Sequence, residues 1–130
     1  VDDTNKTAII YAAGKGFPAI VKLLLVHGVA VNARYGHDLT ALMWTAGYTD
    51  EAGIDDVIRV MNLLLDRGAR IDDRDDRGRT ALMIAAELNH EAIAELLLAR
   101  GADKTLRDKQ GKSASDLTSL TALRDKLASR

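Results

Sequence analysis

A run of acidic residues that ends at a glycine is the first pattern in this chain that could bind a metal ion. The segment from Asp73 to Gly78 reads Asp-Arg-Asp-Asp-Arg-Gly and is similar to the start of a calcium-binding loop. The fifth position is Arg77, however, and the twelfth, where a calcium loop places a bidentate glutamate, is Ile84. The pattern therefore favours an acidic turn over a calcium site.

A second acidic cluster lies shortly before the middle of the chain. Its carboxylates could be read as a cation site, but they lack the ligand spacing of a calcium loop. We expect Asp55 or Asp56 to cap a helix over residues 57–65, and Asp50 and Glu51 to be solvated. The sequence predicts no metal site and no cofactor.

The motifs that could support catalysis are incomplete. His90-Glu91 begins a zinc-protease motif, but the second histidine of that motif would fall at Ala94. Residues 111–113 (Gly-Lys-Ser) are similar to the end of a phosphate-binding loop, but Leu106 stands where that loop needs its first glycine. No serine lies in a Gly-x-Ser-x-Gly elbow that would activate it. We therefore expect no enzymatic activity.

Charge and composition argue against several other functions. A formal net charge of −1 gives no general attraction to nucleic acid or to an anionic membrane. Basic residues in the segment 70–79 alternate with aspartates, so the local field is mixed. The absence of cysteine excludes disulfides and thiolate metal sites. We expect a soluble chain that binds neither nucleic acid nor membranes.

The elements that must position these residues form a repeat. A Thr-Ala opening, a leucine triplet and a closing glycine recur about every 33 residues. The openings are Thr7, Thr40, Thr80 and, in weaker form, Ser113; the triplets begin at Leu23, Leu63 and Leu96; the glycines are Gly28, Gly68 and Gly101. A period in this range indicates stacked units, each of which covers the apolar flank of its neighbour.

The third unit predicts two helices joined by a turn. Thr80 can cap a short helix over residues 81–88, and apolar residues at helical spacing predict a second helix over residues 91–99. Gly101 is expected in the left-handed conformation after this helix. A tight turn before the threonine needs a positive φ at Gly78, whose equivalents in the other units are Asn5, Asp38 and Gly111.

The pattern Asp-x-x-Gly-x-Thr-Ala-Leu-Met-x-Ala-Ala, followed by Leu-Leu-Leu-x-x-Gly-Ala-Asp, resembles the ankyrin repeat over nearly the whole chain. The resemblance implies an all-α repeat solenoid, an ankyrin stack of helix-turn-helix units with β-hairpin fingers. The chain departs from the family where a histidine usually follows the threonine by three places, because Ile10, Met43, Met83 and Asp116 stand there. The Thr-Ala-Leu-Met variants look like those of bacterial ankyrin repeat proteins, which would imply the cytoplasm or the periplasm.

On this resemblance the chain divides into residues 1–39, 40–79, 80–112 and a C-terminal capping repeat, 113–130. The second unit is longer than the others, with about seven extra residues within the segment 47–55. The first unit lacks a polar outer face, because Ile9, Ile20 and Leu24 look like interior residues; we expect a further unit upstream of it. In the capping repeat we expect Leu120, Leu123 and Leu127 to point inward.

The resemblance also implies where a partner binds, namely on the fingers and the exposed side of each first helix. The position four residues after each opening faces this groove in the family, and here it is Tyr11, Trp44, Ile84 and Leu117. These residues predict a contiguous exposed apolar stripe, with a rim formed by His37, Leu39, Tyr48, Arg77 and Arg79. Trp44 and Tyr11 could equally fold onto adjacent repeats and seal the core.

We therefore expect a monomeric, non-catalytic scaffold that binds a protein partner through this groove. Two alternatives stay open. The chain could be an architectural segment of a larger protein with no partner of its own, or it could bind a peptide or small molecule near the insertion.

Overall fold

The computed structural model of the chain describes residues 3–48 and 53–128. Within these ranges the chain forms eight α-helices, one 3₁₀ helix and no strand. The helices are α1 (Asp3–Lys15), α2 (Pro18–Val26), the 3₁₀ helix η1 (Gly36–Asp38), α3 (Ala41–Ala46), α4 (Ile54–Asp66), α5 (Ala81–Glu87), α6 (Glu91–Ala99), α7 (Ala114–Leu117) and α8 (Thr121–Ala128). None of these described helices is long and apolar enough to span a membrane.

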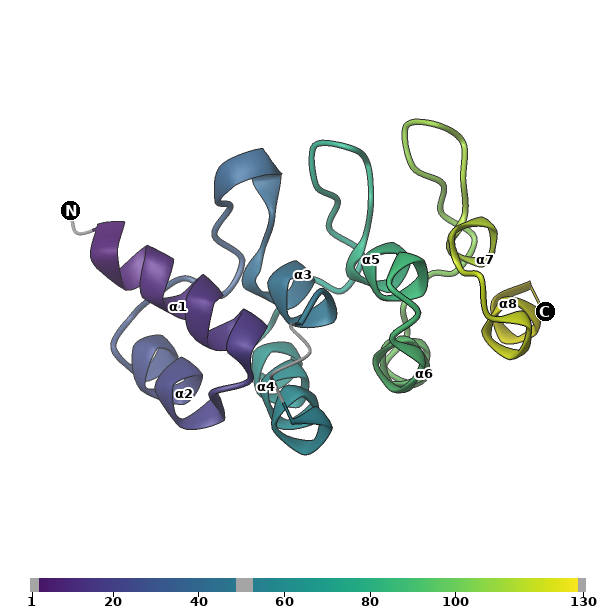
Figure 1. Cartoon of the computed structure of the whole chain (residues 1–130). Coiled ribbons are helices and arrows are strands. Elements are labelled where there is room, and N and C mark those ends of the chain that lie inside the picture. The colour runs from purple at the N-terminus through teal and green to yellow at the C-terminus, as the bar shows by residue number, and fades with distance from the viewer. Residues whose placement is uncertain (1–2, 49–52, 129–130) are drawn as a thin grey trace.

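Figure 1 shows that the helices stack in pairs. The helices α1, α3, α5 and α7 form one row, which we call the inner row, and α2, α4, α6 and α8 form a second, outer row. Long loops between successive pairs project from one edge of the stack, and we call residues 29–39, 69–79 and 102–112 the fingers. This arrangement confirms the all-α repeat solenoid.

Helix ends follow the repeated residues. The Oγ1 atoms of Thr40 and Thr80 each accept a hydrogen bond of 3.3 Å from the backbone N–H three residues later, which caps α3 and α5 as expected. The closing glycines have φ values of 97°, 95° and 97° at Gly28, Gly68 and Gly101. These are left-handed conformations, so the glycines stop α2, α4 and α6.

The first helix differs from the expectation. α1 begins at Asp3, so Thr7 lies within the helix instead of at its start, and Asn5 is not in a positive-φ turn. The turn residues of the later fingers do have positive φ, at Asp38, Gly78 and Gly111. In those units a finger leads into the threonine and forces the helix to begin there, whereas α1 has no described finger before it.

The insertion lengthens α4 at its N-terminus. The helix expected over residues 57–65 begins at Ile54, so Asp55 and Asp56 lie in its first turn and neither caps it. The capping prediction was therefore wrong, although carboxylates in a first turn still oppose the positive end of the helix dipole. The rest of the acidic cluster, Asp50 and Glu51, lies outside the described residues.

The core is built in layers between successive helix pairs. The middle leucines of two triplets, Leu64 and Leu97, are fully buried, so the triplets are in register along the stack. Met43 and Met83, which replace the usual histidine of the family, are also buried. Apolar packing thus fills positions where the family normally has a polar side chain.

The capping helix pair combines a buried and a polar side. Leu123 and Leu127 are buried, as expected. Leu120 is exposed, contrary to the expectation, because it lies before the first turn of α8. The charged residues Arg124 and Asp125 face solvent from α8.

Each finger is closed by the same backbone hydrogen bond, in which an N–H donates to the C=O four residues later. The bonds are Tyr35 to Leu39 (2.9 Å), Asp75 to Arg79 (2.9 Å) and Asp108 to Lys112 (2.8 Å). In the described part of the chain the β-hairpin character of the fingers is limited to a single antiparallel bridge, Arg107 to Ser113.

Neighbouring fingers are also bonded to each other. The N–H of Asp76 donates to the C=O of His37 (2.9 Å), and the N–H of Lys109 donates to the C=O of Arg77 (3.0 Å). These bonds fix the fingers in register beside the inner row, so side chains on the fingers keep a defined position relative to α1, α3 and α5.

Candidate functional site

Tyr11 and Trp44 are exposed together on the inner row. Tyr11, on α1, is 60% exposed, and Trp44, on α3, is 39% exposed. Both line a small depression of about 110 Å³ whose other walls are Ile10, Gly14, Lys15 and Gly47. Helix α1 and helix α3 thus place two aromatic side chains beside one apolar hollow.

The rings of this pair are held in place by their neighbours. A Cβ atom at Gly14 would lie 3.7 Å from Cε3 of Trp44, an ordinary van der Waals distance, so the Trp44 ring lies beside α1 at Gly14. The Nζ atom of Lys15 lies 5.6 Å from the centroid of the Tyr11 ring, within the range of a cation–π contact. Trp44 therefore both seals the layer between α1 and α3 and keeps part of its ring in contact with solvent.

The apolar stripe expected along the inner row does not continue at full exposure. Ile84, at the equivalent position on α5, is only 8% exposed, and Leu117 on α7 is partly buried. The expectation of a contiguous exposed stripe was wrong at Ile84, because this side chain packs against the preceding helix pair: its Cγ2 atom would lie 3.4 Å from a Cβ atom at Gly47. The exposed part of the stripe is confined to Tyr11 and Trp44.

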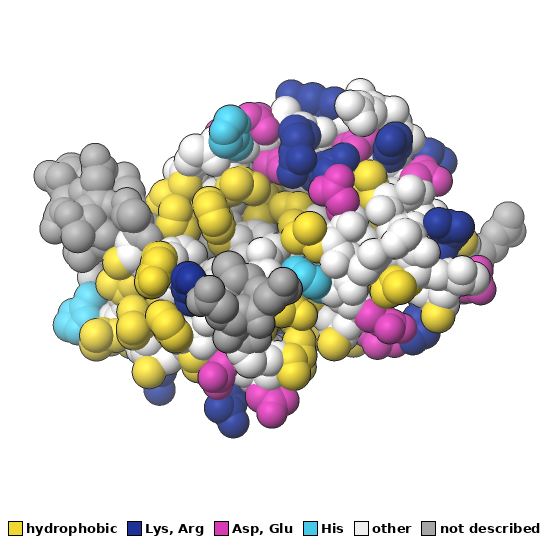
Figure 2. Space-filling model, in the orientation of Figure 1, with side chains coloured by type: hydrophobic (Ala, Val, Ile, Leu, Met, Phe, Trp, Pro, Cys, Tyr) yellow, Lys and Arg dark blue, Asp and Glu magenta, His cyan; other side chains and the backbone are white. Residues whose placement is uncertain are grey.

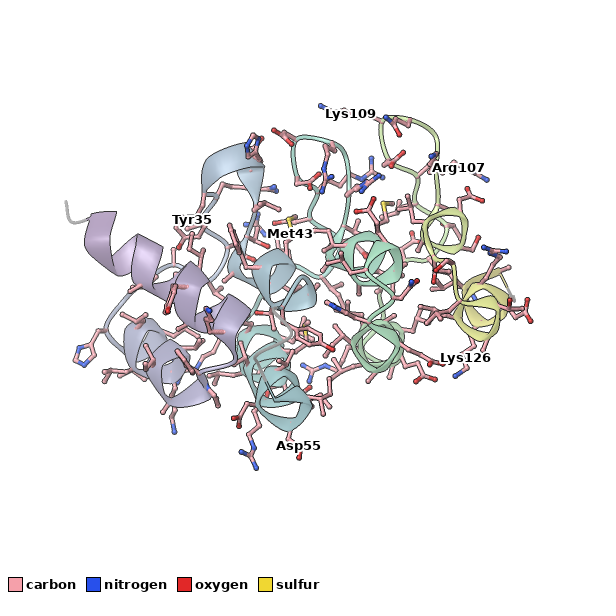
Figure 3. All side chains as sticks on the ribbon, viewed as in Figure 1. Tyr35, Met43, Asp55, Arg107, Lys109 and Lys126 are labelled. Atoms are coloured by element: carbon pink, nitrogen blue, oxygen red, sulfur yellow. The ribbon has the colours of Figure 1, made fainter. Side chains whose placement is uncertain are left out.

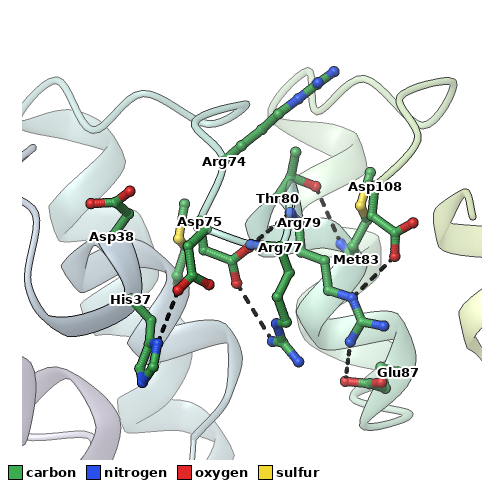
Figure 4. Close-up of polar contacts among 12 residues, drawn as sticks. His37, Asp38, Arg74, Asp75, Arg77, Arg79, Thr80, Met83, Glu87 and Asp108 are labelled. Atoms are coloured by element: carbon green, nitrogen blue, oxygen red, sulfur yellow. Dashed lines mark hydrogen bonds and ion pairs between the residues drawn. The ribbon is translucent and has the colours of Figure 1, made fainter. Parts of the chain in front are cut away.

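A polar cleft lies between the first two fingers. It has a volume of about 250 Å³ and is lined by His37, Leu39, Asp75, Asp76 and Arg77. Nδ1 of His37 lies 2.9 Å from Oδ2 of Asp76, and Nη2 of Arg77 lies 3.5 Å from Oδ2 of Asp75 (Figure 4). Three of the expected rim residues are therefore brought together here, with carboxylates facing the His37 imidazole and the Arg77 guanidinium.

Arg79 has a different environment from the rest of the expected rim. It is buried, with its Nε atom 3.2 Å from Oδ2 of Asp108 and its Nη1 atom 2.6 Å from Oε1 of Glu87 (Figure 4). Burial alone would lower the pKa of Arg79, but the hydrogen bonds and charges of Glu87 and Asp108 outweigh it and raise that pKa. Arg79 ties the second finger to the third finger and to α5.

Asp108 accepts hydrogen bonds in the same pattern as Asp75, whose Oδ1 atom accepts hydrogen bonds of 2.9 Å from the N–H groups of Arg77 and Arg79. The Oδ1 atom of Asp108 accepts hydrogen bonds of 2.9 Å from the N–H groups of Gln110 and Lys112. Burial would raise the pKa of Asp108, but these N–H groups and Arg79 lower it overall. The sequence analysis did not predict that Asp75 and Asp108 anchor the fingers. Their equivalent positions, each three residues before the glycine of its finger, were a usable signal.

Tyr48 lies in a contact between helix pairs. Its ring is 4.0 Å from the His90 ring, centroid to centroid. Nδ1 of His90 lies 2.8 Å from the C=O oxygen of Ala46, which joins the start of α6 to the end of α3. His90 thus lies at the start of α6, and Tyr48 packs on it.

The surface chemistry of the fingers is mixed. Figure 2 shows basic and acidic side chains interspersed over them, with apolar side chains gathered over the N-terminal half of the stack. Arg107 and Lys109 lie on the last finger (Figure 3). Among the described residues no three His, Asp or Glu side chains are grouped so that they could hold a metal ion.

Comparison with known proteins identifies the family. A family model for ankyrin repeats in three copies matches residues 38–108, and a model for a single ankyrin repeat matches residues 4–35. The chain belongs to the ankyrin repeat family. Members of this family are typically non-enzymatic and generally act as protein–protein interaction modules.

Similar proteins carry the repeat as part of longer chains. The Drosophila melanogaster ankyrin repeat and KH domain-containing protein mask is 34% identical over 119 residues, which are 87% of this chain and 3% of the relative. The human ankyrin repeat and KH domain-containing protein 1 is 35% identical over 121 residues, 87% of this chain and 4% of the relative. Mouse ankyrin repeat domain-containing protein 63 is 36% identical over 83 residues, 64% of this chain and 20% of the relative. The chain therefore spans only a small part of the length of these relatives.

Proposed function

We propose that this chain is a non-catalytic module that binds a protein partner through its inner row and fingers. The observation that carries the proposal is the exposed pair Tyr11 and Trp44 beside an apolar hollow. Tryptophan and tyrosine are enriched among interface hot spots, because a large rigid ring contributes contact area at little entropic cost. A hollow of this size suits one apolar side chain of a partner.

The polar cleft between the first two fingers complements this apolar anchor. His37, Leu39 and Arg77 offer the partner an imidazole, an apolar wall and a guanidinium cation, and the carboxylates of Asp75 and Asp76 lie beside them. In the proposed interface the aromatic pair provides affinity, and the cleft provides specificity through charge matching.

The remaining candidate residues support this surface. Arg79 and Ile84 are buried, so we assign them a structural role: Arg79 holds the second finger in place, and Ile84 holds α5. Tyr48 and Leu117, both partly buried, extend the proposed surface only at its edges.

Replacement of Trp44 tests the proposal. The immobilised chain first captures its partner from an extract of the source organism. The affinity of this partner is then measured by titration for the wild type and for the Trp44→Ala variant. We expect Trp44→Ala to weaken binding by about 2 kcal/mol or more, because it removes a hot-spot ring. The matched control is Ile54→Ala on α4, since Ile54 is also 39% exposed but lies on the outer row.

The two variants separate binding from folding. Each is also unfolded in urea and followed by circular dichroism, so that a loss of stability is recognised. Equal affinity of the wild type and Trp44→Ala, with both chains folded, would contradict the proposed interface. A small-molecule site is less favoured at this position, because typical ligand pockets enclose about 300–1,000 Å³, whereas the hollow measures about 110 Å³.

A further inference from the structure

The outer row carries two apolar positions per helix that are buried in every later helix pair. They are four residues apart: Val60 and Leu64 in α4, Ile93 and Leu97 in α6, and Leu123 and Leu127 in α8. Val60, Ile93 and Leu123 are each 0% exposed. The matching residue of α2 is Ile20, which is 46% exposed, and its companion Leu24 is only partly buried.

One further position of the outer row shows the opposite trend. Val21 in α2, Met61 in α4 and Ala94 in α6 are fully buried, whereas the matching residue of α8, Arg124, is exposed. The position of Ile20 is thus open only in the first helix pair, and the position of Val21 only in the last. The simplest geometry is that the first position faces the preceding pair and the second faces the following pair.

The two ends of the stack differ in chemistry. At the α8 end the open position holds a charged arginine. At the α2 end the open position is apolar and has apolar neighbours, so we define the α2 flank by Phe17, Ile20, Leu23 and Leu24. Figure 2 shows apolar side chains gathered toward this end of the molecule. Exposed apolar patches of this kind mark interaction surfaces.

We infer that the α2 flank is a stacking surface for one further ankyrin-type helix pair, placed before α1 in the order of the stack and belonging to the same polypeptide. In α4, α6 and α8 the matching positions are covered within one polypeptide, and the α2 flank continues that series of interfaces. A second copy of this chain is a poor occupant, because its own open end at α8 presents Arg124 where an apolar residue is needed. The occupant must offer apolar residues at positions like Val21 and Leu25.

The test joins an extra helix pair to the complete chain. A copy of residues 74–106 placed directly ahead of Val1 keeps the repeat register, because residue 107 is the equivalent of Val1. Urea unfolding, followed by circular dichroism, is compared for the original and extended chains with Ile20 intact and with Ile20→Asp. We expect the extra pair to raise the unfolding midpoint, because neighbour contacts stabilise a repeat stack.

The substitution distinguishes a stacked pair from a merely attached one. In the extended chain Ile20→Asp should lower the folded-to-unfolded ratio by about tenfold or more, because an apolar side chain would be buried there. In the original chain the same change should have a much smaller effect, since Ile20 is exposed. Lys22→Asp, on the exposed side of α2, is the control and should act equally in both chains. Leu23→Asp, at a position 57% exposed, is a second variant should Ile20→Asp fail to fold.

Two outcomes would overturn the inference. One is an equal effect of Ile20→Asp in the original and extended chains. The other is self-association of the original chain in sedimentation velocity that Ile20→Asp abolishes, since the flank would then bind a second copy.

Discussion

At the scale of single residues, a few buried polar groups determine how the fingers are held. Asp108 accepts hydrogen bonds from two backbone N–H groups of its own finger and pairs with Arg79 of the preceding one. Arg79 in turn pairs with Glu87 on α5. Glu87 and Asp108 thus face the buried guanidinium of Arg79, so removal of Asp108 takes away one of its two charged partners.

The lowered pKa of Asp108 predicts a pH dependence of stability. A carboxyl group whose pKa is lower in the folded state contributes stability above its unfolded pKa of about 3.9 and loses it as the pH falls through the folded value. The free energy of unfolding of the wild type should therefore exceed that of the Asp108→Asn variant by a constant amount near neutral pH. The difference between the two chains should shrink as the solution is acidified below about pH 4. Urea unfolding of both chains between neutral and acidic pH measures this. A difference that persists undiminished in acid would refute the role assigned to the ionised carboxylate.

At the scale of helices and loops, local residue patterns predicted the elements well. The helix expected over residues 91–99 is α6 (Glu91–Ala99), and the helix expected over residues 81–88 ends one residue earlier, at Glu87. Threonine caps and closing glycines act within a few residues of the chain, so the sequence alone reveals them. The start of α4 at Ile54 was not predicted, because no side chain caps this end of the helix and the sequence therefore carries no capping signal there.

Contacts between elements were harder to predict than the elements themselves. The sequence placed Ile9, Ile20 and Leu24 together as uncovered residues, yet Ile9 is fully buried while Ile20 is exposed. The sequence also predicted that both Ile84 and Trp44 are exposed on the inner row, although only Trp44 is. Burial depends on the size of each side chain and on the neighbouring helix pair, and neither follows from the repeat pattern alone.

The closing glycines offer a prediction about single loops. Gly68 has a φ of 95°, and a Cβ atom there would meet nothing within 4 Å, so only the backbone conformation opposes a side chain. Gly68→Ala should therefore destabilise the chain by about 1–2 kcal/mol. Gly36→Ala is the matched control, because Gly36 also has open space around it but no positive φ. Thermal or urea unfolding that showed equal stability for the two variants would be inconsistent with this explanation.

At the scale of the whole molecule, the chain is a stack in which each helix pair covers the next. Stability in such a stack is shared between neighbours, and the inner row and fingers form one continuous surface along it. The aromatic pair Tyr11 and Trp44 lies on this surface where α1 meets α3, so a partner that binds there would contact two helix pairs at once.

Trp44 is the only tryptophan of the chain, so its fluorescence reports on this surface without any substitution. We predict that saturation with a partner that lacks tryptophan shifts the Trp44 emission to shorter wavelength and protects it from quenching by acrylamide, because binding removes the exposed part of the ring from water. An emission spectrum and quenching constant that stay the same in the saturated complex would contradict binding through the inner row.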